Sequence, residues 1–261
     1  MSIEVEIEKI NNQTWRISEV NRETENAVDS YLLCGTRRAV LIDTLMFTSN
    51  LYDIVREFTS LPLDVIITHG HIDHVGESLP VFTENDCAVF MDLRDLFLVE
   101  NTNFDFIKTV NFKDLGDKKL FDLGRRNIEI ISFPGHTPGS LVLLDRNAEL
   151  IFTGDSIGSG PLWMQLPEAL TLPVFEKNLK ELYDNLRCFD NLKIYPGHKM
   201  QSPVLLTSQY IQDTLKLTQD IISGTVVGED DVTVYLGERI PCKKAKNGLM
   251  IGYIYDPNKM K

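Results

Sequence analysis

Thr68-His69-Gly70-His71-Ile72-Asp73-His74-Val75-Gly76 contains three of the five histidines of this 261-residue chain. Its H-x-H-x-D-H spacing would arise by chance on the order of once in ten thousand chains of this composition. Imidazole nitrogens and carboxylate oxygens are the usual zinc ligands where no thiolate is present, and they also suit iron and manganese. The spacing therefore predicts a metal site that uses His69, His71, Asp73 and His74.

The residues before His69 indicate how these side chains reach a metal. Asp64-Val65-Ile66-Ile67-Thr68 is a short, β-branched apolar run, which is typical of a buried strand. If the chain stays extended beyond that strand, His69 and His71 point to the same side, because side chains alternate along a strand. A turn after His71 would carry Asp73 and His74 past a first metal towards a second. The motif therefore predicts two neighbouring ions.

The two remaining histidines lie in glycine-containing turns, and two aspartates end strand-like runs. His136 lies in Pro134-Gly135-His136-Thr137-Pro138-Gly139, and His198 ends Tyr195-Pro196-Gly197-His198. Asp43 ends Arg38-Ala39-Val40-Leu41-Ile42-Asp43, and Asp155 follows Ile151-Phe152-Thr153-Gly154. Taken in this order, the motifs resemble those of the metallo-β-lactamase-fold superfamily, and the resemblance spans roughly residues 14 to 200.

The resemblance implies a fold and a ligand set. The implied fold is α/β, an αββα sandwich of two mixed β-sheets flanked by helices, with the metals at one edge between the sheets. By resemblance, the ligands are His69, His71 and His136 for the first metal, Asp73, His74 and His198 for the second, and Asp155 for both. Asp43 is similar to the family's aspartate that orients a ligand without binding metal. We expect one domain over residues 1–261, with a C-terminal helix and short strands after about residue 200.

The same resemblance implies hydrolysis of a small-molecule ester-type bond. Two divalent ions that share a water lower its pKa to about 7 and polarise a substrate oxygen. We therefore expect attack by a metal-bridging hydroxide, with two Zn²⁺ ions, or iron or manganese as alternatives, and with Asp73 and Asp155 as catalytic residues. Asp155 together with His74 resembles the glyoxalase II, lactonase and phosphodiesterase branches. A thioester or lactone is favoured, and a phosphodiesterase is an alternative.

An oxidoreductase is the alternative from another class of enzymes. Mononuclear iron enzymes of the persulfide dioxygenase type share the histidine run but use only His69, His136 and Asp155 as metal ligands. The oxygen-reducing diiron branch usually has Glu at the position of His71, which counts against that branch. The number and identity of the bound metals would separate these alternatives from the hydrolase.

The acidic composition restricts the partners. Lys and Arg number 26 and Asp and Glu 38, so the formal net charge is −12. Partners with a phosphate backbone favour clustered Lys and Arg, so we expect a small-molecule substrate and neither nucleic acid nor a membrane. The first residues alternate apolar and acidic side chains and lack the signal-peptide pattern. We expect a cytoplasmic protein with its four cysteines as core thiols; the oligomeric state is open, a homodimer included.

Further elements are expected along the chain, mostly from apolar periodicity. The expected strands are residues 3–10, 14–20, 30–34, 38–43, 87–91, several pieces of 119–153, 232–236 and 249–255. The expected helices have the apolar faces Phe47, Leu51, Ile54, Val55, Phe58 and Phe175, Leu179, Leu182, Leu186, Phe189, with others from Gly76 and from about Ser202 to Ser223. Residues 93–112 are open between helix and loop. Lys243, Lys244 and Lys246 suit an anion site or a solvated turn.

Residues 156–172 directly follow Asp155, so their start is expected beside the metals. The glycines and prolines of this stretch predict no regular element, yet its apolar side chains are unusual for a surface loop. Trp163 and Met164 are therefore predicted to line the substrate pocket, since ligand sites are lined mostly by apolar side chains. Packing in the core or at a subunit contact is the alternative.

Overall fold

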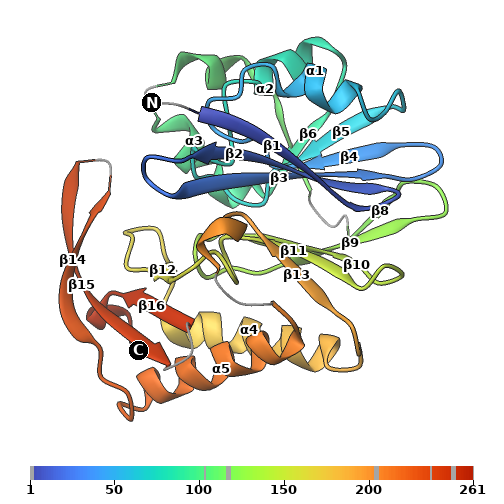
Figure 1. Ribbon diagram of the computed structural model, residues 1–261. Helices are drawn as coiled ribbons and strands as arrows, with labels where there is room; N and C mark the ends of the chain where they lie inside the picture. The colour runs from blue at the N-terminus through green and yellow to red at the C-terminus, as the bar shows by residue number, and fades with distance from the viewer. Residues whose placement is uncertain are drawn as a thin grey trace.

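The computed structural model describes residues 3–102, 104–115, 119–202, 206–235, 237–247 and 251–260. Two β-sheets lie face to face, and helices cover the outer face of each (Figure 1). On one side the helices are α1 (Leu51–Arg56), α2 (Leu79–Glu84) and α3 (Leu96–Glu100). On the other side they are α4 (Leu172–Leu186) and α5 (Ser208–Ile222). The αββα sandwich implied by the family resemblance is therefore confirmed.

The first sheet places the start of the histidine run at its edge. Its strand order is β1 (Ile3–Asn11), β2 (Thr14–Asn21), β3 (Asn26–Cys34), β4 (Ala39–Ile42), β5 (Leu63–Ile66), β6 (Val89–Met91) and β7 (Phe112–Asp114). β4, β5, β6 and β7 pair in parallel. The residues of β4 and β5 are all buried, as is usual for parallel strands covered on both faces. Because their carboxyl ends meet at one edge, the residues that follow β4 and β5 lie close together.

The second sheet brings Asp155 and His198 to one of its edges. Its strand order is β13 (Lys193–Pro196), β11 (Leu150–Gly154), β10 (Leu141–Asp145), β9 (Asn127–Ser132) and β8 (Leu120–Asp122). β11 and β13 are parallel neighbours, whereas the other pairs are antiparallel. Asp155 comes directly after β11 and His198 comes two residues after β13. These two side chains therefore start from the same edge of the second sheet.

A third sheet, which the sequence does not predict, lies beside the sandwich (Figure 1). Its strand order is β12 (Leu162–Met164), β16 (Ile251–Tyr255), β15 (Glu238–Asn247) and β14 (Glu229–Tyr235). The prediction of no regular element in 156–172 is wrong, because β12 pairs in parallel with β16. Lys243, Lys244 and Lys246 lie in β15, so the turn predicted for them is wrong. Lys243 and Lys244 form ion pairs with Asp230 and Asp231 of β14.

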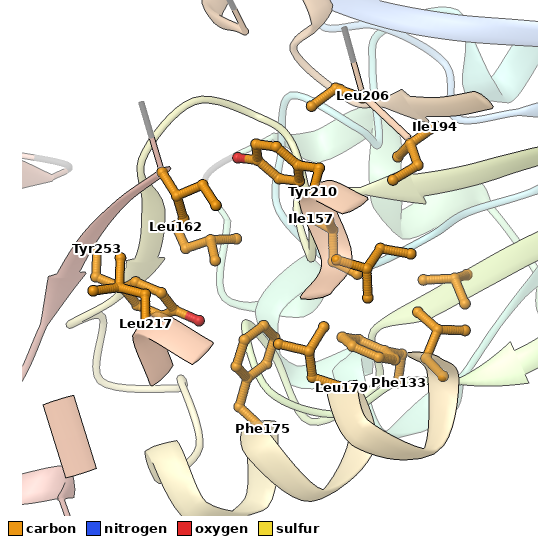
Figure 2. Close-up of a cluster of buried hydrophobic side chains, with 14 of the residues drawn as sticks. Phe133, Ile157, Leu162, Phe175, Leu179, Ile194, Leu206, Tyr210, Leu217 and Tyr253 are labelled. Carbon is orange, nitrogen blue, oxygen red and sulfur yellow. The ribbon is translucent and has the colours of Figure 1, made fainter. Parts of the chain in front are cut away.

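Buried apolar side chains fill the spaces between the layers. Phe82 belongs to the cluster between the first sheet and α1, α2 and α3, and Phe152 belongs to the cluster between the two sheets. A further cluster joins the second sheet, α4, α5 and the third sheet. Figure 2 shows Phe133, Phe175 and Tyr253 of that cluster close together. Burying one such Phe stabilises the fold by roughly 1.5–3 kcal/mol. Because Phe175 of α4 packs against Tyr253 of β16, the third sheet shares this core.

Several helix ends differ from the predicted ends. Phe47 precedes α1 and is 40% exposed, and Phe189 follows α4. α5 begins at Ser208 and not at Ser202. Residues 93–112 contain α3 together with two 3₁₀ turns. None of α1 to α5 has a side-chain hydrogen bond at its N-cap, so this local signal does not mark where these helices begin. The predicted strand ends Leu236 and Leu249 lie outside the described residues.

The cysteines divide into two kinds. All four are free, so no disulfide joins them. Cys34, Cys87 and Cys242 are buried, as predicted for core thiols, whereas Cys188 is exposed and the prediction is wrong there. Among the described residues, no helix is both long enough and apolar enough to cross a membrane.

Candidate metal centre

Asp43 joins the ends of β4 and β5. It follows β4 with a φ of 59°, a conformation that few non-glycine residues adopt. Its carboxylate accepts hydrogen bonds from the backbone N–H of Thr68 at 2.7 Å and from the Thr68 hydroxyl at 2.8 Å. It also accepts one from His74 Nδ1 at 2.8 Å. Asp43 thus fixes the start of the histidine loop and orients the His74 ring, in line with the positioning role implied for it.

Three histidines form the first group of candidate ligands. His71 Nδ1 lies 3.1 Å from His69 Nε2 and 3.0 Å from His136 Nε2. Nitrogens that bind one tetrahedral zinc at about 2.0–2.1 Å would lie about 3.3 Å apart. All three side chains are buried. The separations of these nitrogens therefore fit a shared metal ion.

Asp73, His74, Asp155 and His198 form the second group, and their candidate ligand atoms lie within 4.8 Å of one another. His198 Nε2 is 3.2 Å from Asp73 Oδ2 and 3.3 Å from Asp155 Oδ2. His74 Nε2 is 3.4 Å from Asp155 Oδ1 and 3.9 Å from Asp73 Oδ2. These separations also suit ligands of one ion.

Asp155 lies between the two groups. Besides its contacts with the second group, its Oδ2 is 4.0 Å from His69 Nε2 and 3.9 Å from His136 Nε2. A carboxylate in this position reduces the repulsion between two cations, because it interacts favourably with both. The structure therefore brings all seven predicted ligands together and divides them into the two predicted groups.

Every histidine of the site is held through the ring nitrogen that faces away from its group. The partners are Thr68 Oγ1 for His69 (3.1 Å), Glu168 Oε1 for His71 (2.7 Å), the Trp163 carbonyl for His136 (2.8 Å), Asp43 Oδ2 for His74 (2.8 Å) and the Ala27 carbonyl for His198 (2.7 Å). Such partners fix the tautomer and the ring orientation of a ligating histidine. The other ring nitrogen is then the one that faces its group and could bind a metal.

Two unpaired polar atoms of the second group indicate that a metal fits there. His74 Nε2 and Asp155 Oδ1 are buried and have no hydrogen-bond partner among the described residues. Buried polar atoms are normally paired, since leaving one unpaired costs about 1–3 kcal/mol. A cation bound by both atoms would satisfy them. The donor set is imidazole and carboxylate, which suits zinc, iron or manganese.

The electrostatics of the site agree with cation binding. Burial lowers the pKa of His69 well below its ordinary value and the pKa of His136 to about 4. Both rings are therefore neutral at pH 7, as metal ligation requires. Burial also acts to lower the pKa of His74 and His198, but the neighbouring Asp155 raises both well above the ordinary value. Protons on these two rings balance the carboxylate charge that a bound cation would otherwise balance.

Gly197 lets the backbone approach the second group. A Cβ atom at this position would lie 2.5 Å from His74 Cε1 and 2.7 Å from Asp155 Oδ1. Any side chain would therefore displace a candidate ligand, and glycine is required here. This explains the Pro-Gly-His turn that precedes His198.

A cavity of about 420 Å³ lies over both groups. Its walls beyond the candidate ligands include Asn26, Pro161, Trp163, Leu166, Gln201 and Tyr235. Trp163 lines the cavity because it points to one face of β12. Met164 does not: it points to the opposite face, is 1% exposed and belongs to the core cluster that includes Phe175 and Tyr253.

Glu168 and Tyr235 contribute to the site without a signal in the sequence. Glu168 lies 97 positions after His71, its hydrogen-bond partner. Burial acts to raise the pKa of Glu168, but the bond from His71 lowers it below the ordinary value, so the side chain is a carboxylate. The Tyr235 ring centroid lies 5.9 Å from that of His71 and 6.3 Å from that of Trp163. Only the fold of the C-terminal strands brings Tyr235 to the cavity.

Comparisons with known proteins find relatives in sequence and in fold. The chain is 26% identical over 217 residues to the beta-lactamase-like protein 2 homolog of Drosophila melanogaster, covering 76% of this chain and 68% of that protein. It is 24% identical over 211 residues to acyl-coenzyme A thioesterase MBLAC2 of Gallus gallus, covering 67% of this chain and 74% of that protein. The solved metallo-beta-lactamase from Pontibacter korlensis has the same fold, with a TM-score of 0.66 and 18% identity over 83% of this chain and 100% of that one. The profile of the metallo-beta-lactamase superfamily matches residues 24–198, and the chain belongs to that superfamily.

Proposed function

We propose that this protein is a hydrolase with two divalent metal ions, which cleaves a thioester or lactone bond of a small molecule. The observation that carries the proposal is the position of Asp155 between two complete ligand groups at the floor of a cavity. Two ions held by these groups would lower the pKa of a shared water to about 7 and polarise a carbonyl oxygen. Zinc is the proposed metal, with iron or manganese as alternatives.

Asp73 and Asp155 are the proposed catalytic residues. The Asp73 side chain is 28% exposed and lines the cavity, whereas that of Asp155 is 15% exposed. Burial acts to raise the pKa of Asp73, but His74 and His198 lower it below its ordinary value, so Asp73 is ionised. An ionised carboxylate open to the cavity can accept a hydrogen bond from the attacking water and orient it. Asp155 contributes by reducing cation repulsion.

The cavity suits a small acyl compound. Trp163, Leu166 and Tyr235 form an apolar wall, while Asn26 and Gln201 supply polar groups. Ligand sites generally combine such an apolar lining with a few polar groups that orient the ligand. One relative, MBLAC2, is named as an acyl-coenzyme A thioesterase, which supports a thioester as the bond cleaved.

A hydrolysis panel tests the proposal directly. The metal-loaded protein should cleave thioesters or lactones faster than phosphodiesters and β-lactams, and a chelator should abolish the reaction until metal is added back. Preferred cleavage of phosphodiesters would replace the proposed substrate class. Oxygen-dependent turnover of a persulfide by protein with one iron would replace hydrolysis itself.

Trp163→Ala should change which acyl chain lengths are preferred. The indole forms part of the cavity wall while its neighbours Leu162 and Met164 pack in the core, so truncation enlarges the cavity and leaves the core intact. We expect kcat/KM to shift towards longer or bulkier acyl groups, with metal content and melting temperature unchanged. Kinetics on a series of acyl chain lengths measures the shift in kcat/KM. Elemental analysis and a thermal melt measure the metal content and the melting temperature.

Trp15→Ala is the matched control for this variant. Trp15 is also partly buried, but it lies on β2 of the first sheet and packs against Phe58, which follows α1, away from the cavity. This control should lower stability and leave the ranking of acyl chains as in the wild type. If Trp163→Ala instead loses stability and keeps the wild-type ranking, Trp163 has a packing role and does not select substrate.

A further inference from the structure

Glu168 contacts a ligand of the first group from a segment that has no metal ligand of its own. Its Oε1 accepts a hydrogen bond from His71 Nε2 at 2.7 Å, and the two side chains are only 8% and 7% exposed. His71 differs from the other histidines of its group because it presents Nδ1 to them. Its Nε2 must therefore carry the proton, and the Glu168 carboxylate fixes that tautomer.

The same segment also holds a second histidine of the first group. The carbonyl of Trp163 accepts the hydrogen bond from His136 Nδ1 at 2.8 Å. Leu170 N–H donates to the carbonyl of Gly135, next to His136, at 2.7 Å. Residues 163–170 therefore support two of the three histidines of the first group.

The second group has different supports. His74 is held by Asp43 and His198 by the carbonyl of Ala27, both on the first sheet side of the site. Neither histidine bonds to residues 163–170 in the described structure. A change confined to Glu168 therefore acts on one ligand group and leaves the supports of the other in place.

Lys259 fastens this segment from the C-terminal end of the chain. Its ammonium group donates to the carbonyls of Leu166 at 2.7 Å, Pro167 at 3.0 Å and Ala169 at 2.6 Å. The strand before it, β16, pairs with β12 at the start of the segment. Both β16 and Lys259 lie beyond residue 198, where the superfamily match ends. This support therefore comes from a part of the chain that the superfamily profile does not match.

We propose that Glu168 is a positioning residue for the first metal group, and that Lys259 keeps it in place by holding the loop of residues 166–169. The proposal rests on the metal site of the proposed function. A carboxylate behind a ligating histidine raises the basicity of the ligand, and loss of such a partner typically weakens metal binding by about 10- to 100-fold. Glu168→Gln keeps the shape of the side chain and removes the charge, so the loss should fall on the first group alone.

Metal affinity in single-site backgrounds tests this. His198→Ala damages the second group and His136→Ala damages the first, so each leaves one intact group. Zn²⁺ affinity is measured by competition with a chromophoric chelator, and Co²⁺ absorption reports the coordination. Adding Glu168→Gln to His198→Ala should weaken Zn²⁺ binding by about 10- to 100-fold. Adding it to His136→Ala should leave Zn²⁺ binding unchanged.

Two further variants serve as controls. Glu181→Gln changes an exposed glutamate on α4 and should affect neither background. Lys259→Met should weaken the first group in the same direction as Glu168→Gln, by a smaller factor, since the His71 contact itself is kept. Glu168→Asp, which retains the charge, should bind Zn²⁺ more tightly than Glu168→Gln.

The outcomes separate this proposal from the proposed function. Unchanged affinity in the His198→Ala background, or equal losses in both backgrounds, would overturn the role of Glu168 while the dinuclear site stands. A wild-type protein that binds none of Zn²⁺, iron and manganese would overturn both proposals.

Discussion

Asp155→Ala should lower turnover by orders of magnitude and reduce metal occupancy in at least one ligand group. Asp155 is within 3.4 Å of His74 Nε2 and 3.3 Å of His198 Nε2, and its Oδ2 also lies about 4 Å from two histidines of the first group. Removing the carboxylate would delete a proposed ligand and leave less negative charge between the two proposed cations. At close range in a buried site, the repulsion between two such cations amounts to several kcal/mol.

Elemental analysis and kcat/KM on the preferred substrate measure the two effects. Asp190→Ala is the matched control, because it removes an exposed carboxylate outside both ligand groups. It should behave as the wild type. Near-normal kinetics and metal content in Asp155→Ala would show that the bridging role belongs to another group.

The ligand set could be predicted only partly from the local sequence, because several of the candidate ligands follow strand ends. Asp155 follows β11 directly, and His69 follows β5 within three residues. Parallel neighbours bring such ends to one sheet edge, so positions far apart in the chain meet without any contact having to be known in advance. The spacing within the histidine run indicated a metal site, and the family resemblance implied how the ligands divide between two ions.

The cavity wall could not be predicted in the same way. Trp163 and Met164 are consecutive, and in a strand they must point to opposite faces. Which of the two faces the cavity depends on the pairing of β12 with β16, about 90 positions later in the chain. Without that partner strand, the sequence shows only an apolar stretch broken by glycine and proline. The same long-range pairing explains why the third sheet was missed.

The contact of Glu168 with His71 could not be predicted from the sequence either. A lone glutamate after a proline resembles any surface residue, and most glutamates are exposed. Its burial against His71 follows from the loop that Lys259 holds in place. Those contacts join three separate parts of the chain, so no local pattern indicates them.

The dinuclear site is tested most directly by counting metal ions in the purified, carefully metal-loaded protein. The wild type should contain two ions per chain, because the structure brings together two groups of candidate ligands. His74→Ala and His198→Ala each remove a ligand of the second group only, so each variant should contain about one ion and should lose most of its turnover. A wild-type content of one ion, unchanged in both variants, would contradict the dinuclear site.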